Sequence, residues 1–146
     1  MALLLGLLFL VVLIVEAESG GAAAGPWTIA GVASQAGFSG LDLVTAVAVA
    51  YAESSGNPQA VGDNGNSIGL WQINLPNHPE YQGVDLTDPQ TNANAAFAIY
   101  SAAGNSFSPW TTFKTGAYQS NLDQAQSDVG DLSADSGDDS GDSENG

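Results

Sequence analysis

The chain has 146 residues, of which one is basic and 16 are acidic, and its formal net charge is −15. This length is enough for one domain with appended segments. The single basic residue, Lys114, cannot neutralise several phosphates, which excludes nucleic-acid binding and electrostatic docking to an anionic membrane. The absence of cysteine excludes disulfide bonds, zinc–thiolate sites and cysteine nucleophiles. We expect neither a metal nor a cofactor.

Residues 1–20 form a distinct N-terminal segment, in which residues 2–15 (ALLLGLLFLVVLIV) contain no polar side chain. This run is shorter than the ~20 apolar residues that a membrane span needs. It has the length of a signal-peptide core, and residues 15–17 resemble a cleavage site, but no basic residue precedes it. Two interpretations stay open: a signal peptide, or a retained anchor that inserts into a membrane. In either case we expect export to the cell envelope or beyond it.

Residues 26–120 hold all three tryptophans and are expected to form one mainly helical domain with a small β or irregular lobe. Pro26 and Gly37 are typical of the first turn and the end of a helix, and predict a short helix over residues 27–35. Ser39 and Asp42 then have the spacing of a capping box.

The capping box predicts a second helix over residues 41–54, ending at Gly56 with Pro58 just beyond. Its apolar positions recur at helical spacing, so one face should be buried. The positions expected on that face are Leu43, Ala46, Val47, Ala50 and Glu53.

Turn chemistry follows in VGDNGNS, where Asn64-Gly65 favours a hairpin, and the apolar residues 68–74 favour a strand. Together these residues predict a small lobe over residues 59–75. Asp88 and Pro89 have the N-cap and N1 preferences that start a helix over residues 90–103.

Beyond that helix, Ser108-Pro109 predicts the start of a last short helix over residues 110–115, which ends at Gly116. Residues 121–146 are rich in Asp, Ser and Gly and are predicted to be a disordered acidic tail, because few apolar side chains offset the ordering entropy. The spacing of its acids matches no metal site. The acidic residues of this tail are Asp123, Asp128, Asp131, Asp135, Asp138, Asp139, Asp142 and Glu144.

Glu53 is the carboxylate with the most unusual setting, because it lies in the last turn of an otherwise apolar helix. Desolvation and the negative end of the helix dipole should both raise its pKa. A carboxylic acid that stays protonated near neutral pH can protonate the leaving oxygen of a glycosidic bond. The alternative is a solvated glutamate at a fraying helix end, although no cation lies near it in the sequence.

Three blocks of the chain resemble the lysozyme-like superfamily, in particular its lytic transglycosylase (SLT-type) domains. YAESSGNPQAVGDNGNSIGLWQIN is similar to the family pattern of E-S-x-G-N-P, a turn, and S-x-G-L-x-Q. LTDPQTNANAAFAIY resembles its D-P-x-x-N stretch, and FSPWTTFKTGAY is similar to a block of lysozyme-like domains in phage virion and tail proteins. The resemblance covers residues 27–118 and implies a lysozyme-like fold.

The resemblance also implies a role for each matching residue. Glu53 matches the catalytic general acid and Ser54 supports its geometry. Ser67 and Gln72 match residues that line the glycan cleft, and Gly69 matches a position where the backbone approaches the sugar. The remaining substrate-binding residues that it implies are Asn92, next to the acid, and Tyr118, pointing at the acid or the substrate.

The implied reaction is cleavage of the β-1,4 bond between N-acetylmuramic acid and N-acetylglucosamine in peptidoglycan. In transglycosylases of this superfamily the 6-hydroxyl of the substrate attacks and leaves a 1,6-anhydro end. An inverting hydrolase instead needs a second carboxylate to activate water. Asp63 is the candidate for that base, although its DNGN context also fits a simple turn.

Three functional hypotheses remain. The first is an enzyme that degrades peptidoglycan, by transglycosylation or by hydrolysis with Asp63. The second is a catalytically silent glycan-binding component of a virion or envelope. The third is a membrane-anchored adhesive protein with an acidic tail, which accounts for the ends of the chain only. If the protein is viral, we expect it in the virion.

Two further sets of residues have an alternative functional interpretation. Trp71, Tyr100 and Trp110 could stack on sugar rings, but buried aromatic residues of this kind are more often part of the core. His78 lies in a loop between two prolines and is expected to be solvated.

Overall fold

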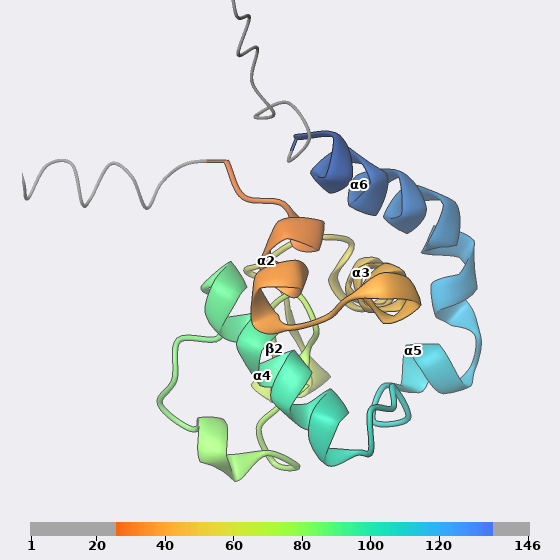
Figure 1. Cartoon of the computed structure of the whole chain (residues 1–146). Helices are drawn as coiled ribbons and strands as arrows, with labels where there is room; N and C mark the ends of the chain where they lie inside the picture. Colours follow the sequence, from red (N-terminus) through yellow and green to blue (C-terminus); the bar gives the residue numbers. More distant parts are fainter. Residues whose placement is uncertain (1–25, 136–146) are drawn as a thin grey trace, which may run out of the picture.

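The computed structural model describes residues 26–135 of the chain (Figure 1). Its α-helices are α2 (Ile29–Ala36), α3 (Gly40–Ser54), α4 (Pro89–Ala102), α5 (Thr111–Lys114) and α6 (Leu122–Asp135). Its strands are β1 (Val61–Gly62), β2 (Ser67–Ile68) and β3 (Ile73–Asn74), and its 3-10 turns are η1 (Asp63–Gly65), η2 (Pro79–Tyr81) and η3 (Ala117–Asn121). The structure therefore confirms a mainly helical fold with a small β lobe.

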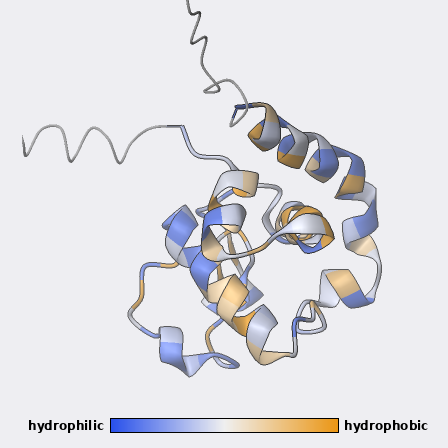
Figure 2. Ribbon diagram, in the orientation of Figure 1, coloured by the Kyte–Doolittle hydropathy of each residue, from blue (hydrophilic) through white to orange (hydrophobic). Residues whose placement is uncertain are grey.

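Helix α3 is the central element, with α2, α4, α5 and α6 arranged around it (Figure 1). Both α2 and α6 contact α3 directly, and α2 also packs on α4. Residues 46–50 of α3 are all fully buried, so the middle of this helix is enclosed on every side rather than on the single face expected from its sequence. Apolar residues accordingly gather on α3 in the interior (Figure 2). Its many alanines allow the surrounding elements to approach closely.

The sequence predicted where the helices start, but not always which side chains cap them. Helix α3 begins after Ser39, yet the Ser39 side chain makes no capping hydrogen bond. Asp42 does not complete a capping box either, because it accepts a hydrogen bond from the Tyr100 hydroxyl of α4 and raises the pKa of Tyr100 to about 12. In α2 the cap is Thr28, whose side chain accepts from the Gly31 amide at 2.9 Å, rather than a turn started by Pro26.

The β lobe is a three-stranded antiparallel sheet in the order β1-β2-β3. The hairpin expected at Asn64-Gly65 is present, with Val61 opposite Ile68 and Gly62 opposite Ser67. The strand expected over residues 68–74 is instead two short strands separated by a turn at residues 69–72. This turn directs Trp71 into the core, where it is fully buried.

The prediction that residues 121–146 form a disordered tail is wrong for its first half. Leu122–Asp135 is helix α6, which lies along α2 and α3 (Figure 1). Ala125 is fully buried, and Leu122, Val129 and Leu132 pack on the core. The Tyr51 hydroxyl of α3 also donates to Asp128 at 2.5 Å. These contacts supply the burial that the composition of the tail alone did not indicate.

The structure leaves both ends of the chain undescribed. Residues 1–25, which include the predicted signal peptide or anchor, lie outside the described residues, as do residues 136–146 of the predicted tail. Among residues 26–135, none of the helices combines the length and apolar character needed to cross a bilayer.

Candidate active site

A cleft of about 440 Å³ runs between the β lobe and the segment that leads into α5. The end of α3 reaches it through Glu53, the lobe through Asp63, Ser67 and Gln72, and α5 through Thr112. It therefore joins residues from all three motif blocks. The remaining lining residues are Ile73, Asn74, Asn77, His78, Ile99, Pro109, Trp110 and Thr111.

Glu53 is the penultimate residue of α3 and is half-buried at the cleft. Its Oε1 atom accepts a hydrogen bond from the Thr112 hydroxyl at 2.8 Å. Burial raises the pKa of the Glu53 carboxyl, hydrogen bonds from Thr112 lower it, and the nearby Asp63 carboxylate raises it again; the net pKa lies above the usual value. This direction is the one expected from the sequence, and it favours the protonated form that can act as an acid.

Asp63 and Ser67 face the cleft as a hydrogen-bonded pair. The Ser67 hydroxyl donates to Asp63 Oδ2 at 2.6 Å, and it accepts from the Asn74 amide at 3.1 Å. Ser67 is nearly completely buried, whereas Asp63 is exposed. Asp63 has a φ of 50°, so it is also a turn residue in the left-handed region. The structure thus brings the possible second carboxylate to the same cleft as Glu53.

Gln72 lines the cleft, as expected, but its amide also holds the lobe together. Its Nε2 atom donates to the carbonyl oxygens of Ala60 at 3.0 Å and Gly69 at 2.9 Å. Both donor hydrogens are therefore used within the lobe.

Asn92 and Gly69 lie outside the cleft lining, and their positions give them a structural role instead. Asn92 is fully buried; its Oδ1 accepts from the Trp71 amide at 2.9 Å, and its Nδ2 donates to the carbonyls of Ile68 and Leu86. A Cβ on Gly69, whose φ is +81°, would lie 2.1 Å from Asn92 Nδ2. Gly69 is needed for close packing against Asn92, rather than against a sugar.

Ser54 and Tyr118 also lie outside the cleft lining. The buried Ser54 hydroxyl donates to the Ala50 carbonyl one turn earlier at 2.9 Å, at the end of the helix that carries Glu53. The Tyr118 ring packs on Phe113, with ring centroids 4.9 Å apart, and adjoins the core. Ser54 therefore supports the helix end, and Tyr118 packs rather than pointing into the cleft.

Burial separates the three aromatic residues, Trp71, Tyr100 and Trp110, that could stack on sugar rings. Trp71 and Tyr100 are core residues. Trp110 is mostly buried but lines the cleft, and its Nε1 donates to the Trp71 carbonyl at 2.9 Å. Trp71 Nε1 in turn donates to the Ala46 carbonyl of α3 at 2.9 Å. These two bonds connect the lobe, α3 and the segment before α5, and so stabilise the relative position of the cleft walls.

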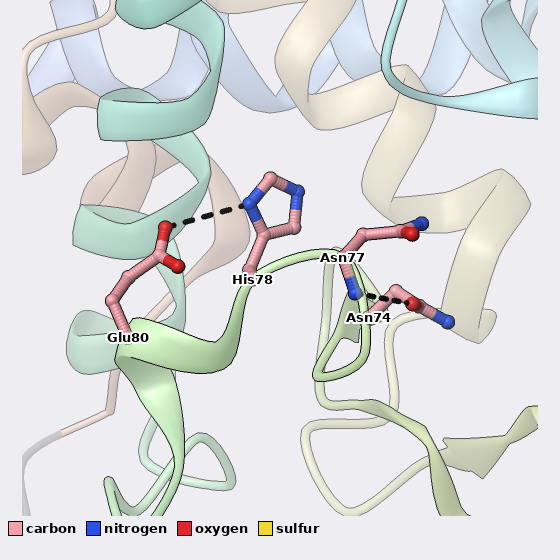
Figure 3. A network of polar contacts seen from close by, with 4 residues as sticks. All are labelled: Asn74, Asn77, His78 and Glu80. Atoms are coloured by element: carbon pink, nitrogen blue, oxygen red, sulfur yellow. Dashed lines mark hydrogen bonds and ion pairs between the residues drawn. The ribbon is translucent and has the colours of Figure 1, made fainter.

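The sequence did not identify Thr112, Asn77 or His78 as site residues. His78 is half-buried at the cleft, not simply solvated, and its Nδ1 lies 3.5 Å from Glu80 Oε1 (Figure 3). Asn77 lies in a turn in which its backbone amide donates to the side-chain oxygen of Asn74, Oδ1, at 3.1 Å (Figure 3). The only available signal for Thr112 was its place in the WTTF block.

The fold and the cleft define a class of protein. A mainly helical domain with a small antiparallel lobe places a protonation-prone glutamate at the end of its central helix, facing a cleft between the two parts. A comparison with family models matches residues 30–112 to the lysozyme-like domain, and the chain belongs to this family. Comparisons with curated proteins and with solved structures gave no match. The family supports an enzyme of the peptidoglycan-degrading glycosidase kind.

Proposed function

We propose that this protein cleaves the β-1,4 bond between N-acetylmuramic acid and N-acetylglucosamine, with Glu53 as the general acid and the glycan's own 6-hydroxyl as the nucleophile. The observation that carries the proposal is the setting of Glu53, which combines burial, a raised pKa and a place on the cleft wall. Because peptidoglycan lies outside the cytoplasmic membrane, the proposal includes export of the domain by residues 1–20.

The proton balance of this reaction needs a single carboxyl group. Protonated Glu53 gives its proton to the glycosidic oxygen as the bond to the muramoyl C1 breaks. The resulting carboxylate then accepts the proton of the muramoyl 6-hydroxyl as that oxygen bonds to C1. Glu53 is thereby returned to its protonated form, and the product carries a 1,6-anhydro end.

Hydrolysis is the second candidate, because Asp63 lies on the same cleft and acts electrostatically on Glu53. Asp63→Asn separates the two reactions. We expect this variant to keep much of its activity on purified peptidoglycan and to keep the anhydro product, as measured by mass analysis of the digest. Reducing ends in the wild-type digest, together with a loss of activity in Asp63→Asn as large as in Glu53→Gln, would establish hydrolysis instead.

Thr112 is proposed to position the acid, since its hydroxyl is bonded to Glu53 Oε1. We expect Thr112→Val to lower the maximal rate about fivefold, because a net hydrogen bond contributes ~1 kcal/mol. The alkaline limb of the kcat–pH profile should move to higher pH, because the lost side-chain hydrogen bond favoured the ionised acid.

Two variants control for a general loss of structure. Thr112→Ser keeps the hydroxyl and should retain both the rate and the alkaline limb. Thr45→Val makes the same change as Thr112→Val on α3, where the hydroxyl bonds only the Leu41 carbonyl at 3.1 Å, and should leave both unchanged. An alkaline limb that stays in place in Thr112→Val would exclude a bond to Glu53 during turnover.

A further inference from the structure

The cleft is lined by acidic side chains without basic ones to balance them. Glu53 and Asp63 are carboxyl groups, and no Lys or Arg is among the residues that line it. Lys114, the single basic residue of the chain, also lies outside the lining. His78 is the one lining residue that can become cationic, and its ring already lies beside the Glu80 carboxylate (Figure 3). An anionic group that enters this cleft would therefore find no cation free to pair with it.

The chemistry of the glycan makes this charge distribution relevant to its choice of substrate. Each muramoyl ring carries a lactyl group on the same ring as the bond that Glu53 would cleave. With a stem peptide attached, the lactyl carbonyl is a neutral amide. Without the peptide it is a carboxylate, which must enter the cleft together with the reacting C1.

We propose that the cleft selects muramoyl residues whose lactyl group is linked to peptide and discriminates against peptide-free ones. This inference rests on the proposed function. A free lactyl carboxylate would be partly desolvated in a cleft that also holds the Asp63 carboxylate, and both desolvation and like-charge repulsion are unfavourable. An amide-linked lactyl group is neutral, so it enters without this cost a cleft that is also lined by the polar amides of Asn74 and Asn77. The acidic groups of the stem peptide itself lie farther from the bond, where solvent screens them.

Three preparations of glycan strands of equal length test the proposal: with stem peptides, after their removal by an amidase, and after the freed lactyl carboxylates have been converted to methylamides. We expect kcat/KM to be about 10-fold to 100-fold lower on the peptide-free strands at low salt. The methylamide strands should recover most of that loss, since they restore neutrality without restoring the peptide. The difference should shrink in ~1 M salt, where the screening length falls to ~3 Å.

A pair of variants tests whether the effect comes from the cleft. Asn77 is an exposed lining residue, and Asn77→Lys places a cation there. We expect this variant to raise kcat/KM on peptide-free strands several-fold relative to peptide-bearing ones. Gln35→Lys makes the same change in net charge on the exposed surface of α2, away from the cleft, and should leave this ratio unchanged.

The outcomes separate the inference from the proposed function. Equal kcat/KM on all three preparations would overturn charge selection while leaving the proposed cleavage intact. Slow cleavage of both peptide-free and methylamide strands would also overturn it, because recognition would then depend on the peptide. A protein that cleaves none of the three preparations would overturn the proposed function, and the inference with it.

Discussion

Glu53→Gln is expected to lower the rate of peptidoglycan cleavage by about 10²-fold to 10⁴-fold, the contribution of a positioned general acid. Glutamine keeps the shape of the side chain and can still accept the hydrogen bond from Thr112, but it has no proton to transfer. The rate of release of soluble glycan fragments from purified peptidoglycan measures the effect. Full activity in Glu53→Gln would overturn the assignment of the acid.

The stability of Glu53→Gln should hold or rise, and the sign follows from the raised pKa of Glu53. A carboxyl group whose pKa is higher in the folded protein binds more protons when folded than when unfolded. Its contribution to stability is therefore lost as the pH rises from the unfolded pKa through the folded one. Glutamine removes this dependence. Thermal unfolding at neutral pH distinguishes a catalytic defect from a folding defect, and Asp123→Asn, an exposed change on α6, is the matched loss of one carboxylate.

Deletion of residues 122–146 is expected to reduce stability by about 2–4 kcal/mol, which for a domain of this size corresponds to roughly 10–20 °C in Tm. The reason is helix α6, whose Ala125 is fully buried and whose Leu122, Val129 and Leu132 cover the core. The deletion also removes the hydrogen bond between Tyr51 and Asp128; burial, together with this bond, raises the pKa of Tyr51 to about 12. Thermal unfolding followed by circular dichroism measures the change.

Deletion of residues 136–146 alone is the control, because it leaves the whole of α6 in place. We expect this shorter deletion to leave Tm nearly unchanged. If deletion of residues 122–146 has equally little effect, then α6 does not stabilise the domain. Tyr51→Phe gives an intermediate test, since it removes one hydrogen bond and should cost about 1 kcal/mol.

The sequence was most informative where structure depends on neighbouring residues. Asp88 and Pro89 predicted the start of α4, and the Asp88 side chain indeed accepts from the Thr91 amide at 2.9 Å. Gly37 was expected to end α2, and it does so with a φ of 127°. The composition of the segment after Asn121 was misleading, because its few apolar residues fall on the side of α6 that meets the core.

The candidate site shows the same division between local and distant determinants. The motif by itself identified Glu53, Ser67 and Gln72 as residues that line the cleft, because they lie close together in the chain, at the end of α3 and in the small lobe. The sequence predicted that Asn92 and Gly69 bind substrate, because a motif does not distinguish a residue that binds a ligand from one that packs inside the protein. Burial makes that distinction: Asn92 is fully enclosed, with two hydrogen bonds to the backbone of the lobe and a third to the Leu86 carbonyl.

The sequence by itself therefore determined the approximate bounds of α2, α3, α4 and α5, the place of the small lobe and the position of Glu53 at the end of α3, since capping, turn and periodicity signals act over a few residues. Only the tertiary structure decided that Thr112 bonds Glu53, that Asp63 faces the same cleft, and that α6 belongs to the fold. Each of these contacts joins residues far apart in the chain, such as Glu53 and Thr112. Their free energy comes from burial and hydrogen bonding that exist only once the elements have packed.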